Sequence, residues 1–542
     1  MASGPGSGAP GARSWGRDAA ADWLARALML ALVVAAALQL AAPARAAPAL
    51  ASADVARRLA SGKAVTLRNA TLRGDLDLGD VARVRGSFRC LDCRLEGSLL
   101  GEDVVFEQTV NLSGSEIAGR VALEGATFQA PALFGSPPGN PASFLGRVDL
   151  KLATFEDLVS FQQATFMAPA DFTLARFRDD VVFAQAELAG GASFDSAVFA
   201  GRTRFDRSSF GNPGIRLRPA RGQCEPGGVS EGRASFERAA FRAAADFRAA
   251  SFQGDACFRA ADFEGRADFS QAEFTKQAIF DLARFSQEAT FRGAEFIGES
   301  SQLAGGFDRV RALGLLEFTA ATFANQTFFT NIVAPRLSIT DAHFEAPKPP
   351  LVITDISAED FVMDVDSIEA VQDQGDVRER VLELIESGAK ARGDLVLAND
   401  AHYRLEVLRS NDYAWPLQAL DFVFYRGVAG YLVRPVHPIV TLLALVLVVS
   451  AIRSSWRSRR VSGSSNVQTR AFSVDAKRSF RGLLDRFGHE VLDTLVVIWP
   501  GKGEAQLGRR FESNVYRVLV VCALFGLANS NPTLRQMLDA VR

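Results

Sequence analysis

Residues 234–274 decide the fold, and they read ASFERAAFRAAADFRAASFQGDACFRAADFEGRADFSQAEF. A phenylalanine stands at every fifth or sixth position, and a small residue, most often alanine, stands two positions before it. Steps of five and six residues alternate, so the true period is 11. The phenylalanines of this stretch are Phe236, Phe241, Phe247, Phe252, Phe258, Phe263, Phe269 and Phe274.

The same rhythm covers much of the chain. It runs from Phe106 to Phe134, from Phe144 to Phe210 and from Phe236 to Phe296, with interruptions rich in Gly and Pro between these parts. After Phe296 the large apolar residues keep the step less regularly, and we expect the repeat to fray there. The tripeptide Ala342-His343-Phe344 is interpreted as a late corner of the repeat.

A period of 11 is also typical of right-handed helical supercoils, so this alternative needs a test. The apolar positions within one period are 0, 2, 6 and 8, and at roughly 100° per residue they point in no single direction. The local pattern Ala-x-Phe has a period of two, as in a short strand with both side chains on one face. The pattern therefore favours short strands joined by similar corners.

The tripeptide Ala-Asp-Phe recurs at 170–172, 245–247, 261–263 and 267–269. On these residues the chain resembles the pentapeptide-repeat proteins, from about Leu67 to Phe344. The resemblance implies an all-β, right-handed quadrilateral β-helix. The sixth residue at alternate steps departs from the family pattern and implies looser corners, with four steps, or two full periods, in each coil. Each inward Phe is then expected to stack on the residue two periods away.

The predicted domain organisation has five parts. Residues 1–46 are expected to be a signal peptide, 47–64 a short linker, and 65–365 the solenoid with inserts at 135–143 and 211–232. Residues 366–425 form an α-helical linker, with one helix from Asp376 and another from about Gly393 to Arg409. Residues 426–542 form a membrane module, with transmembrane helices at about 432–452 and 515–529 and a basic loop at 453–512.

The predicted location is the cell membrane with the solenoid outside. Arginines, a 16-residue apolar stretch (27–42) and Ala44-Arg45-Ala46 have the order of a cleavable signal, with an uncleaved anchor as the alternative. The loop between Arg453 and Glu512 has 12 Lys/Arg against 6 Asp/Glu, which favours the cytoplasmic side. The excess of Arg over Lys and the abundance of Ala and Gly are typical of a bacterial chain.

The five cysteines divide unevenly along the chain. Four of them, Cys90, Cys93, Cys224 and Cys257, lie in the part expected to be exported, and this even number suggests two disulfides. We favour the pair Cys224–Cys257, although spacing alone does not fix the connectivity. A single CxxC gives little support to a zinc or redox site, so structural thiols are the simpler interpretation.

The sequence offers no catalytic, cofactor-binding or metal-site residues to nominate. His343 and His402 are interpreted as surface or packing residues, and 501–503 lacks the frame of a phosphate loop. Between Phe144 and Ser300 there are 19 Lys/Arg and 22 Asp/Glu, too balanced for a mimic of DNA. We therefore predict a non-enzymatic protein without cofactors and without a nucleic-acid partner.

The predicted function is a membrane-anchored scaffold whose partners are the lipid bilayer and a protein on the solenoid surface, with homo-oligomers possible. The alternative is a degenerate two-helix channel or transport accessory. Around Gly430-Tyr431 and Arg434-Pro435 the chain resembles the linker of pentapeptide-repeat proteins with a potassium-channel-like C-terminus. The stretch 494–503 contains no carbonyl ladder of the kind that such a selectivity filter needs.

Overall fold

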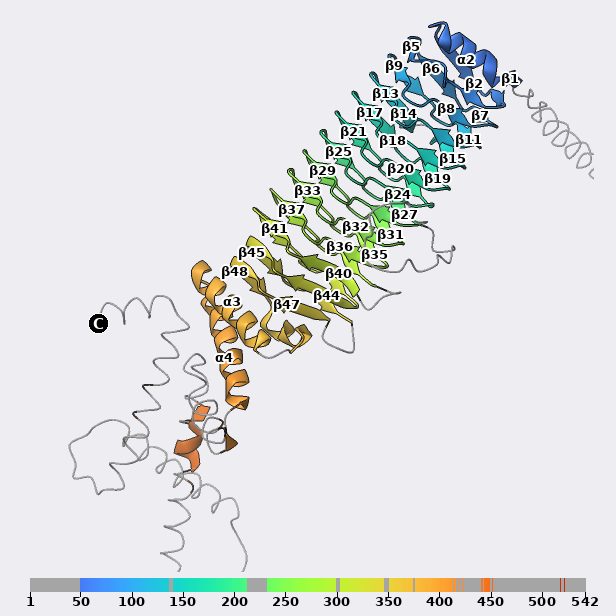
Figure 1. Cartoon of the computed structure of the whole chain (residues 1–542). Helices are drawn as coiled ribbons and strands as arrows, with labels where there is room; N and C mark the ends of the chain where they lie inside the picture. The colour runs from blue at the N-terminus through green and yellow to red at the C-terminus, as the bar shows by residue number, and fades with distance from the viewer. Residues whose placement is uncertain are drawn as a thin grey trace, which may run out of the picture.

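The structure is a computed structural model that describes residues 49–135, 140–211, 232–298, 303–345, 350–373 and 376–412. It also describes 414, 415, 418, 422, 440, 441, 443–448, 451, 517 and 521. As far as residue 363, the described chain forms one elongated solenoid of short parallel strands, with helices at its two ends (Figure 1).

Each coil of the solenoid has four walls. In the coil formed by residues 142–163, wall 1 carries β15 (Ser143–Phe144) and wall 2 carries β16 (Val148–Asp149). Wall 3 carries β17 (Thr154–Phe155), and wall 4 carries β18 (Val159–Phe161). The next coil pairs with this one in parallel, with Val148 opposite Ala170, two periods further along the chain. The predicted coil length is confirmed, and the right hand of the coil stays a prediction.

The walls extend along the whole solenoid. Wall 1 is a 13-stranded sheet from β1 (Ala49–Ala51) to β46 (His343–Phe344), and wall 2 is a 12-stranded sheet from β4 (Leu76–Asp77) to β47 (Leu351–Thr354). Wall 3 begins at β5 (Arg83–Val84) and wall 4 at β2 (Val65–Arg68). These two walls count as one 23-stranded sheet because β45 (Val333–Ile339) pairs with strands of both.

Phenylalanine rings fill the interior in four columns, one against each wall. Within a column the rings stack, as Phe172 does on Phe194 with centroids 4.8 Å apart and planes 4° apart. Between the columns of walls 2 and 4 the rings meet edge to face, as Phe258 and Phe247 do at 5.4 Å and 88°. Both geometries are favourable for aromatic pairs. The predicted stacking at the coil repeat is confirmed, and there are four such columns.

Two kinds of corner explain the alternating steps. In a five-residue step the small inward residue donates its N–H to the carbonyl three positions back, as Ala153 does to Leu150 at 3.2 Å and Ala164 to Phe161 at 3.0 Å. Such a corner places one residue at positive φ, for example Leu152 at 57°, which is typical of a type II turn. The six-residue step from Phe155 to Phe161 has one more residue and no such turn bond, so the looser corner is confirmed there.

The Asp of Ala-Asp-Phe closes the tight corners. The Asp carboxylate accepts a hydrogen bond from the N–H two residues later: Thr173 donates to Asp171 at 3.1 Å, Arg248 to Asp246 at 3.1 Å and Ser270 to Asp268 at 3.0 Å. Asn and Asp stabilise turns in this way. Asp262 precedes a six-residue step, and its carboxylate accepts no such bond from any described residue. The local corner therefore explains the preference for Asp at this position.

The two kinds of corner predict different costs for the same substitution. Asp246→Ala removes the bond to the Arg248 N–H and should lower stability by about 1.5–3 kcal/mol, the range for hydrogen bonds to charged groups. Asp262→Ala should change it by less than about 0.5 kcal/mol. Thermal midpoints of the two purified variants test this difference. Equal midpoints would show that the Asx contact does not stabilise the corner.

The segment expected to be a short linker, 47–64, instead caps the solenoid. It forms β1 and helix α2 (Ser52–Ala60), whose Val55 and Leu59 are buried against the first coil. Ser52 Oγ donates to the carbonyl of Gly74 at 2.7 Å. The helix forms because the first coil would otherwise leave its apolar interior open to water.

The expected fraying after Phe296 is wrong. The strands lengthen there, as in β40 (Leu303–Asp308), β44 (Gln326–Thr330) and β48 (Ser357–Met363), and the stacking continues to Phe344. Aliphatic residues take many of the inward positions, including Val310, Leu316, Ile332 and Leu337, and all are fully buried. The fold requires an apolar inward side chain, so the loss of the Phe rhythm did not mark the end of the repeat.

Two helices close the C-terminal end, as predicted. A 3-10 helix, η1 (Val365–Ala370), leads to α3 (Val377–Arg392) and α4 (Leu395–Asn411). A Cβ atom at Gly388 would lie 3.1 Å from the backbone N and O of Phe361, so α3 lies very close to β48. Arg392 forms an ion pair with Asp360 of the same strand. The pair of helices therefore covers the last coil.

One titratable pair holds α3 against α4. His402 Nδ1 lies 3.2 Å from Glu386 Oε1, and Lys390 also pairs with Glu386. The bond to Glu386 raises the pKa of His402 despite its burial. Burial opposes ionisation of Glu386, but hydrogen bonds from His402 and Lys390 prevail and lower its pKa to about 2.

The pair makes the stability of this cap depend on pH. The His402 contribution is complete below its ordinary pKa of 6.5 and is lost as the pH rises through its raised folded value. The Glu386 contribution is complete above 4.5 and is lost as the pH falls towards about 2. Hydrogen exchange of the α4 amides, corrected for intrinsic rates, should therefore accelerate from pH 6 to 9. The variant His402→Asn should lose this dependence; an unchanged dependence would exclude His402 as its source.

The remaining sequence predictions fall largely on other parts of the chain. The signal peptide (1–46) and the basic loop (453–512) lie outside the described residues, as do most residues of the predicted spans at 432–452 and 515–529. Within the described ranges, no helix has the length and hydropathy that crossing a bilayer requires.

Candidate interaction surface

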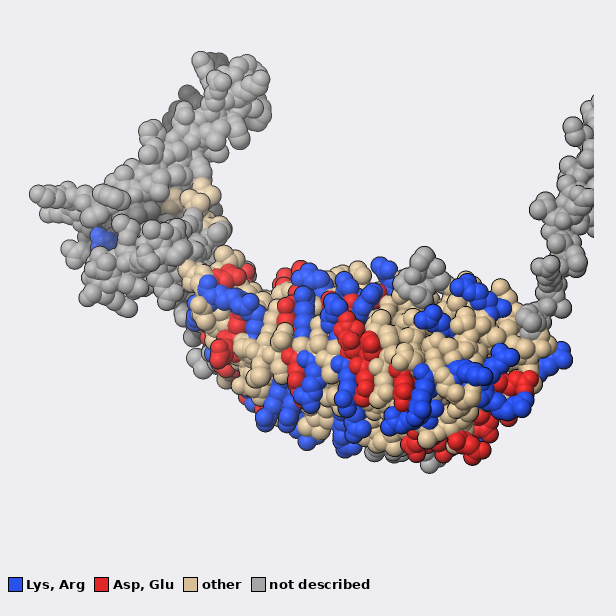
Figure 2. Space-filling view, turned by 90° about the horizontal axis from the view of Figure 1, so that it is seen from above, with Lys and Arg blue, Asp and Glu red and all other residues tan. Residues whose placement is uncertain are grey.

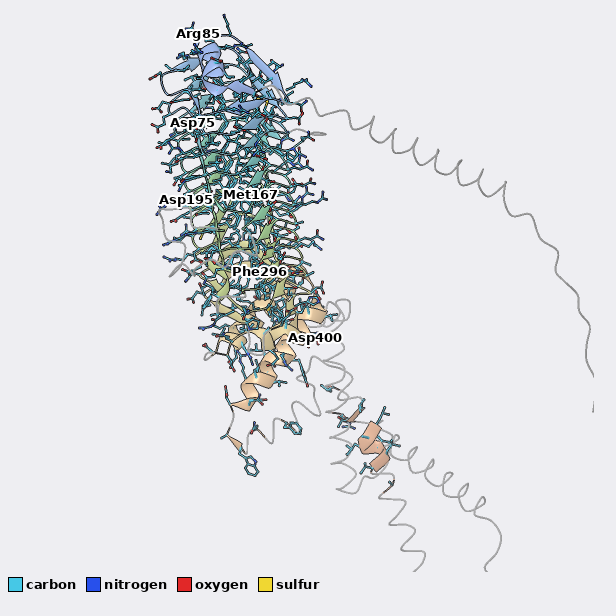
Figure 3. The ribbon with its side chains drawn as sticks, turned by 90° about the vertical axis from the view of Figure 1, so that its right-hand side faces the viewer. Asp75, Arg85, Met167, Asp195, Phe296 and Asp400 are labelled. Atoms are coloured by element: carbon cyan, nitrogen blue, oxygen red, sulfur yellow. A yellow bond between two sulfur atoms is a disulfide. The ribbon has the colours of Figure 1, made fainter. Side chains whose placement is uncertain are left out.

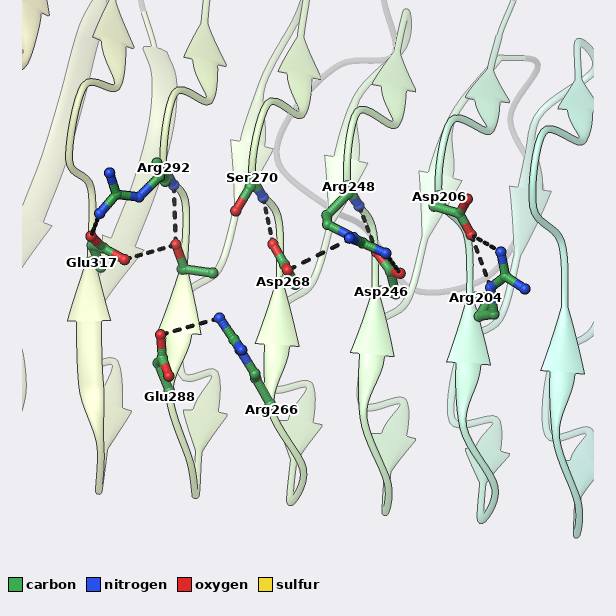
Figure 4. A network of polar contacts seen from close by, with 11 residues as sticks. Arg204, Asp206, Asp246, Arg248, Arg266, Asp268, Ser270, Glu288, Arg292 and Glu317 are labelled. Atoms are coloured by element: carbon green, nitrogen blue, oxygen red, sulfur yellow. Dashed lines mark hydrogen bonds and ion pairs between the residues drawn. The ribbon is translucent and has the colours of Figure 1, made fainter.

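The outer walls neutralise most of their own charge. Arginines pair with a carboxylate one coil away, as Arg202 does with Asp180 at 2.7 Å and Arg292 with Glu317 at 2.6 Å. Figure 4 shows a run of these contacts across neighbouring coils. In Figure 2 the basic and acidic side chains form adjacent bands across the C-terminal half of the solenoid. Exposed pairs stabilise a fold little, so the main consequence is a surface with little net field.

Seven large apolar side chains are exposed on the described part of the solenoid, and four of them lie in two neighbouring coils; the other three are Leu282, Leu313 and Val333. Between residues 49 and 281, the described residues of this kind are Leu145, Leu152, Met167 and Leu174, which are 41–50% exposed. Figure 3 labels Met167 about midway along the solenoid. Leu145 and Met167 line one edge of wall 2 and Leu152 and Leu174 the other, beside β16 and β20 (Ala170–Asp171). We call these four residues the wall-2 patch.

Two of the patch residues occupy a backbone conformation that leucine rarely adopts. Leu152 and Leu174 have φ of 57° and 61°. In other coils this corner position is held by varied residues, from Gly125 and Asn331, which tolerate positive φ well, to Arg238 and Leu282, which do not. The left-handed region costs roughly 1–2 kcal/mol for a residue with a Cβ. Both leucines are therefore exposed and in an unfavourable conformation, so replacing them with a residue that accepts positive φ should not destabilise the corner.

A charged strip that is neutral overall separates the two apolar edges. Asp171 is almost buried, and its Oδ2 lies 3.4 Å from Arg147 Nη2 and 3.6 Å from Lys151 Nζ. Lys151 also lies 3.4 Å from Asp149. Burial alone would lower the pKa of Lys151, but attraction to Asp171 and Asp149 raises it. The patch therefore presents aliphatic edges around two cations and two anions.

The sequence interpretation missed this patch, although a signal was present. Leu145 and Met167 directly follow inward phenylalanines, and Leu152 and Leu174 stand two positions after inward residues. All four are large apolar residues that do not fit the steps of five and six. The repeat marks only the buried positions. Large apolar residues at other positions are therefore the sequence signal for an exposed patch.

Three of the four predicted cysteines, Cys90, Cys93 and Cys257, are disulfide-bonded in the part of the chain that the structure describes. Cys90 and Cys93 form a disulfide across a tight corner, with both residues buried. Cys257 is disulfide-bonded, and the expected pairing with Cys224 falls outside the described residues. His343 is exposed, and its Nδ1 lies 3.1 Å from the carbonyl of Asp341. Among the described side chains, no group of three or more His, Cys, Asp or Glu is arranged to hold a metal ion.

Comparison with known proteins agrees with the fold. A family model for pentapeptide repeats, with nine copies, matches residues 142–187 and 236–284. The first of these ranges contains the wall-2 patch. Searches of curated proteins and of solved structures gave no match. The chain thus contains pentapeptide repeats in a β-solenoid.

Proposed function

We propose that this pentapeptide-repeat solenoid is a non-enzymatic scaffold that binds a protein partner at the wall-2 patch. The observation that carries the proposal is that two neighbouring coils hold four of the seven large apolar side chains exposed on the described part of the solenoid. Contiguous apolar patches on soluble surfaces commonly mark interaction sites. The neutral strip between the edges favours a partner with apolar contacts on both sides of a polar centre and little net charge.

The rigidity of the solenoid suits this role. Stacked rings and in-register strands fix the patch on a framework that has little freedom to rearrange. A preorganised surface loses less entropy on binding than a flexible one. The described residues add no observation in favour of the channel-like alternative.

We also propose a location for the scaffold. The disulfide Cys90–Cys93 and the disulfide-bonded Cys257 support an oxidising compartment, since such bonds are rare in the cytosol. The apolar sequence at 439–452 supports a tether in the bilayer, and its described residues Leu443, Leu447 and Val448 expose aliphatic side chains. We propose that the solenoid stands outside the cell membrane.

The partner site can be tested with a substitution that should not unfold the protein. Leu152→Asn together with Leu174→Asn removes both apolar side chains from one edge and places residues there that accept positive φ. The thermal midpoint should stay the same or rise, and recovery of the partner in affinity capture with quantitative mass spectrometry should fall at least tenfold.

Leu282→Asn is the matched control. Leu282 has the same corner conformation, with φ of 61°, but lies four coils after Leu174 along the solenoid. It should affect the midpoint in the same direction and leave capture unchanged. A set of captured proteins that does not differ between wild type and the double variant would contradict the proposed site.

The proposed location predicts where a thiol on the solenoid reacts. Arg176 is exposed on wall 3, so Arg176→Cys places a thiol in solution. A membrane-impermeant maleimide should label this variant in intact cells as fully as it does after lysis. Labelling that requires lysis would place the solenoid inside and remove the topological part of the proposal.

A further inference from the structure

Parallel stacking in register places equivalent outward residues of neighbouring coils directly opposite each other, so like charges at these positions repel. Residues of the same column lie about 4.8 Å apart in neighbouring coils, and like charges directly opposite each other are destabilising. Elsewhere an opposite charge bridges such pairs. Asp246 and Asp268 are in register, and Arg248 lies 2.6 Å from the first and 3.8 Å from the second. Asp149 and Asp171 are bridged by Lys151 in the same way.

Two like-charge pairs in the last third of the solenoid have no such bridge. On wall 1, Glu273 of β35 (Glu273–Phe274) is in register with Glu295 of β39 (Glu295–Phe296). On wall 3, Arg284 of β37 (Arg284–Phe285) is in register with Arg311 of β41 (Arg311–Ala312).

These four side chains form no ion pair with any described residue, although Asp262 is in register with Arg284 on the preceding coil. Glu273 receives only weak hydrogen bonds, from Ser251 Oγ at 3.3 Å and Thr275 Oγ1 at 3.5 Å. Arg284, Arg311 and Glu295 are exposed. Their charges are therefore available to another molecule.

The acidic pair and the basic pair belong to the same two coils and to opposite walls. The chain visits walls 1, 2, 3 and 4 in order, so walls 1 and 3 face away from each other across the core. In Figure 1 the strands of wall 1 and those of wall 3 follow opposite long edges of the solenoid. The outward residues that precede these pairs in register are Ser209 and Ser251 on wall 1, and Val198, Ala240 and then Asp262 on wall 3.

We propose that copies of this chain associate side by side, with wall 1 of one copy against wall 3 of the next. A sideways shift without rotation brings Glu273 and Glu295 to within half a coil repeat, about 2.4 Å, of the height of Arg284 and Arg311 of the neighbour. Both pairs have the spacing of the coil repeat, so two ion pairs form together. The interface joins two different surfaces, so it extends into a row instead of closing as a dimer.

Charge reversal in the full-length protein tests this arrangement. Sedimentation velocity at low salt should show association that depends on concentration. Either Glu273→Arg with Glu295→Arg, or Arg284→Glu with Arg311→Glu, should weaken it at least tenfold. An equimolar mixture of the two variants should restore it, because each then offers the charge that the other lacks. Salt at 0.5 M should weaken the wild-type association, as expected for exposed charges.

Arg176→Glu is the matched control, since Arg176 is exposed on wall 3 while its coil carries Thr165 on wall 1. It should leave association unchanged. Association through the apolar C-terminal sequence would persist in every variant, so wild-type association equal to that of both reversal variants would overturn the proposal. The proposal would also be overturned by a mixture that fails to associate although both variants keep the wild-type thermal midpoint.

A crosslinking experiment tests the same interface without reversing any charge. Arg311→Lys keeps the positive charge and supplies an amine for a carbodiimide. Zero-length crosslinked peptides should join position 311 to Glu273 or Glu295, which within one copy lie on the far side of the core. Their absence would contradict the interface. The inference is independent of the wall-2 patch, because the Leu152→Asn, Leu174→Asn variant should associate as wild type does.

Discussion

Inward stacking of apolar side chains at the coil repeat is the constraint on which the whole structure depends. A buried phenylalanine contributes up to about 3 kcal/mol of transfer free energy, but no coil can bury its own interior alone. Each ring gains its contact from the ring one coil away, as Phe236 does from Phe258 at 4.8 Å. This requirement fixes the register, and the register then determines which outward residues become neighbours.

The surface follows from this register. An arginine on one coil reaches a carboxylate on the next because their columns are held at one height, as with Arg336 and Asp360 at 2.7 Å. The same constraint makes an uncompensated pair such as Arg284 and Arg311 conspicuous, since neither can move away from the other without disturbing the core. The two proposed surfaces therefore differ in chemistry: the wall-2 patch is apolar and locally neutral, whereas walls 1 and 3 carry open charge.

Much of the fold could be predicted from the sequence because burial repeats with a short period. The inward Phe and Ala positions, the coil of two periods and the two helices after Asp376 all have local signals. Helix α2 was missed because only the open end of the first coil gives Val55 and Leu59 something to pack against. The solenoid was expected to reach residue 365, but its regularity beyond Phe296 was underestimated because aliphatic residues such as Val310 and Leu316 fill inward positions there. The disulfide Cys90–Cys93 could not be predicted because sequence spacing does not show which corner brings two thiols together. The wall-2 patch could not be predicted because spacing does not show which residues are exposed.

The coil repeat also sets distances along the solenoid in equal steps. Removal or duplication of one whole coil within a regular stretch would leave every wall, column and corner type as it is and would change only the length, by about 4.8 Å per coil. The height of Met167 above the C-terminal helices is thus counted in whole coils, roughly eight of them, or about 38 Å. Evolution can adjust how far such a surface stands from the C-terminal helices in discrete steps, without redesigning the surface itself.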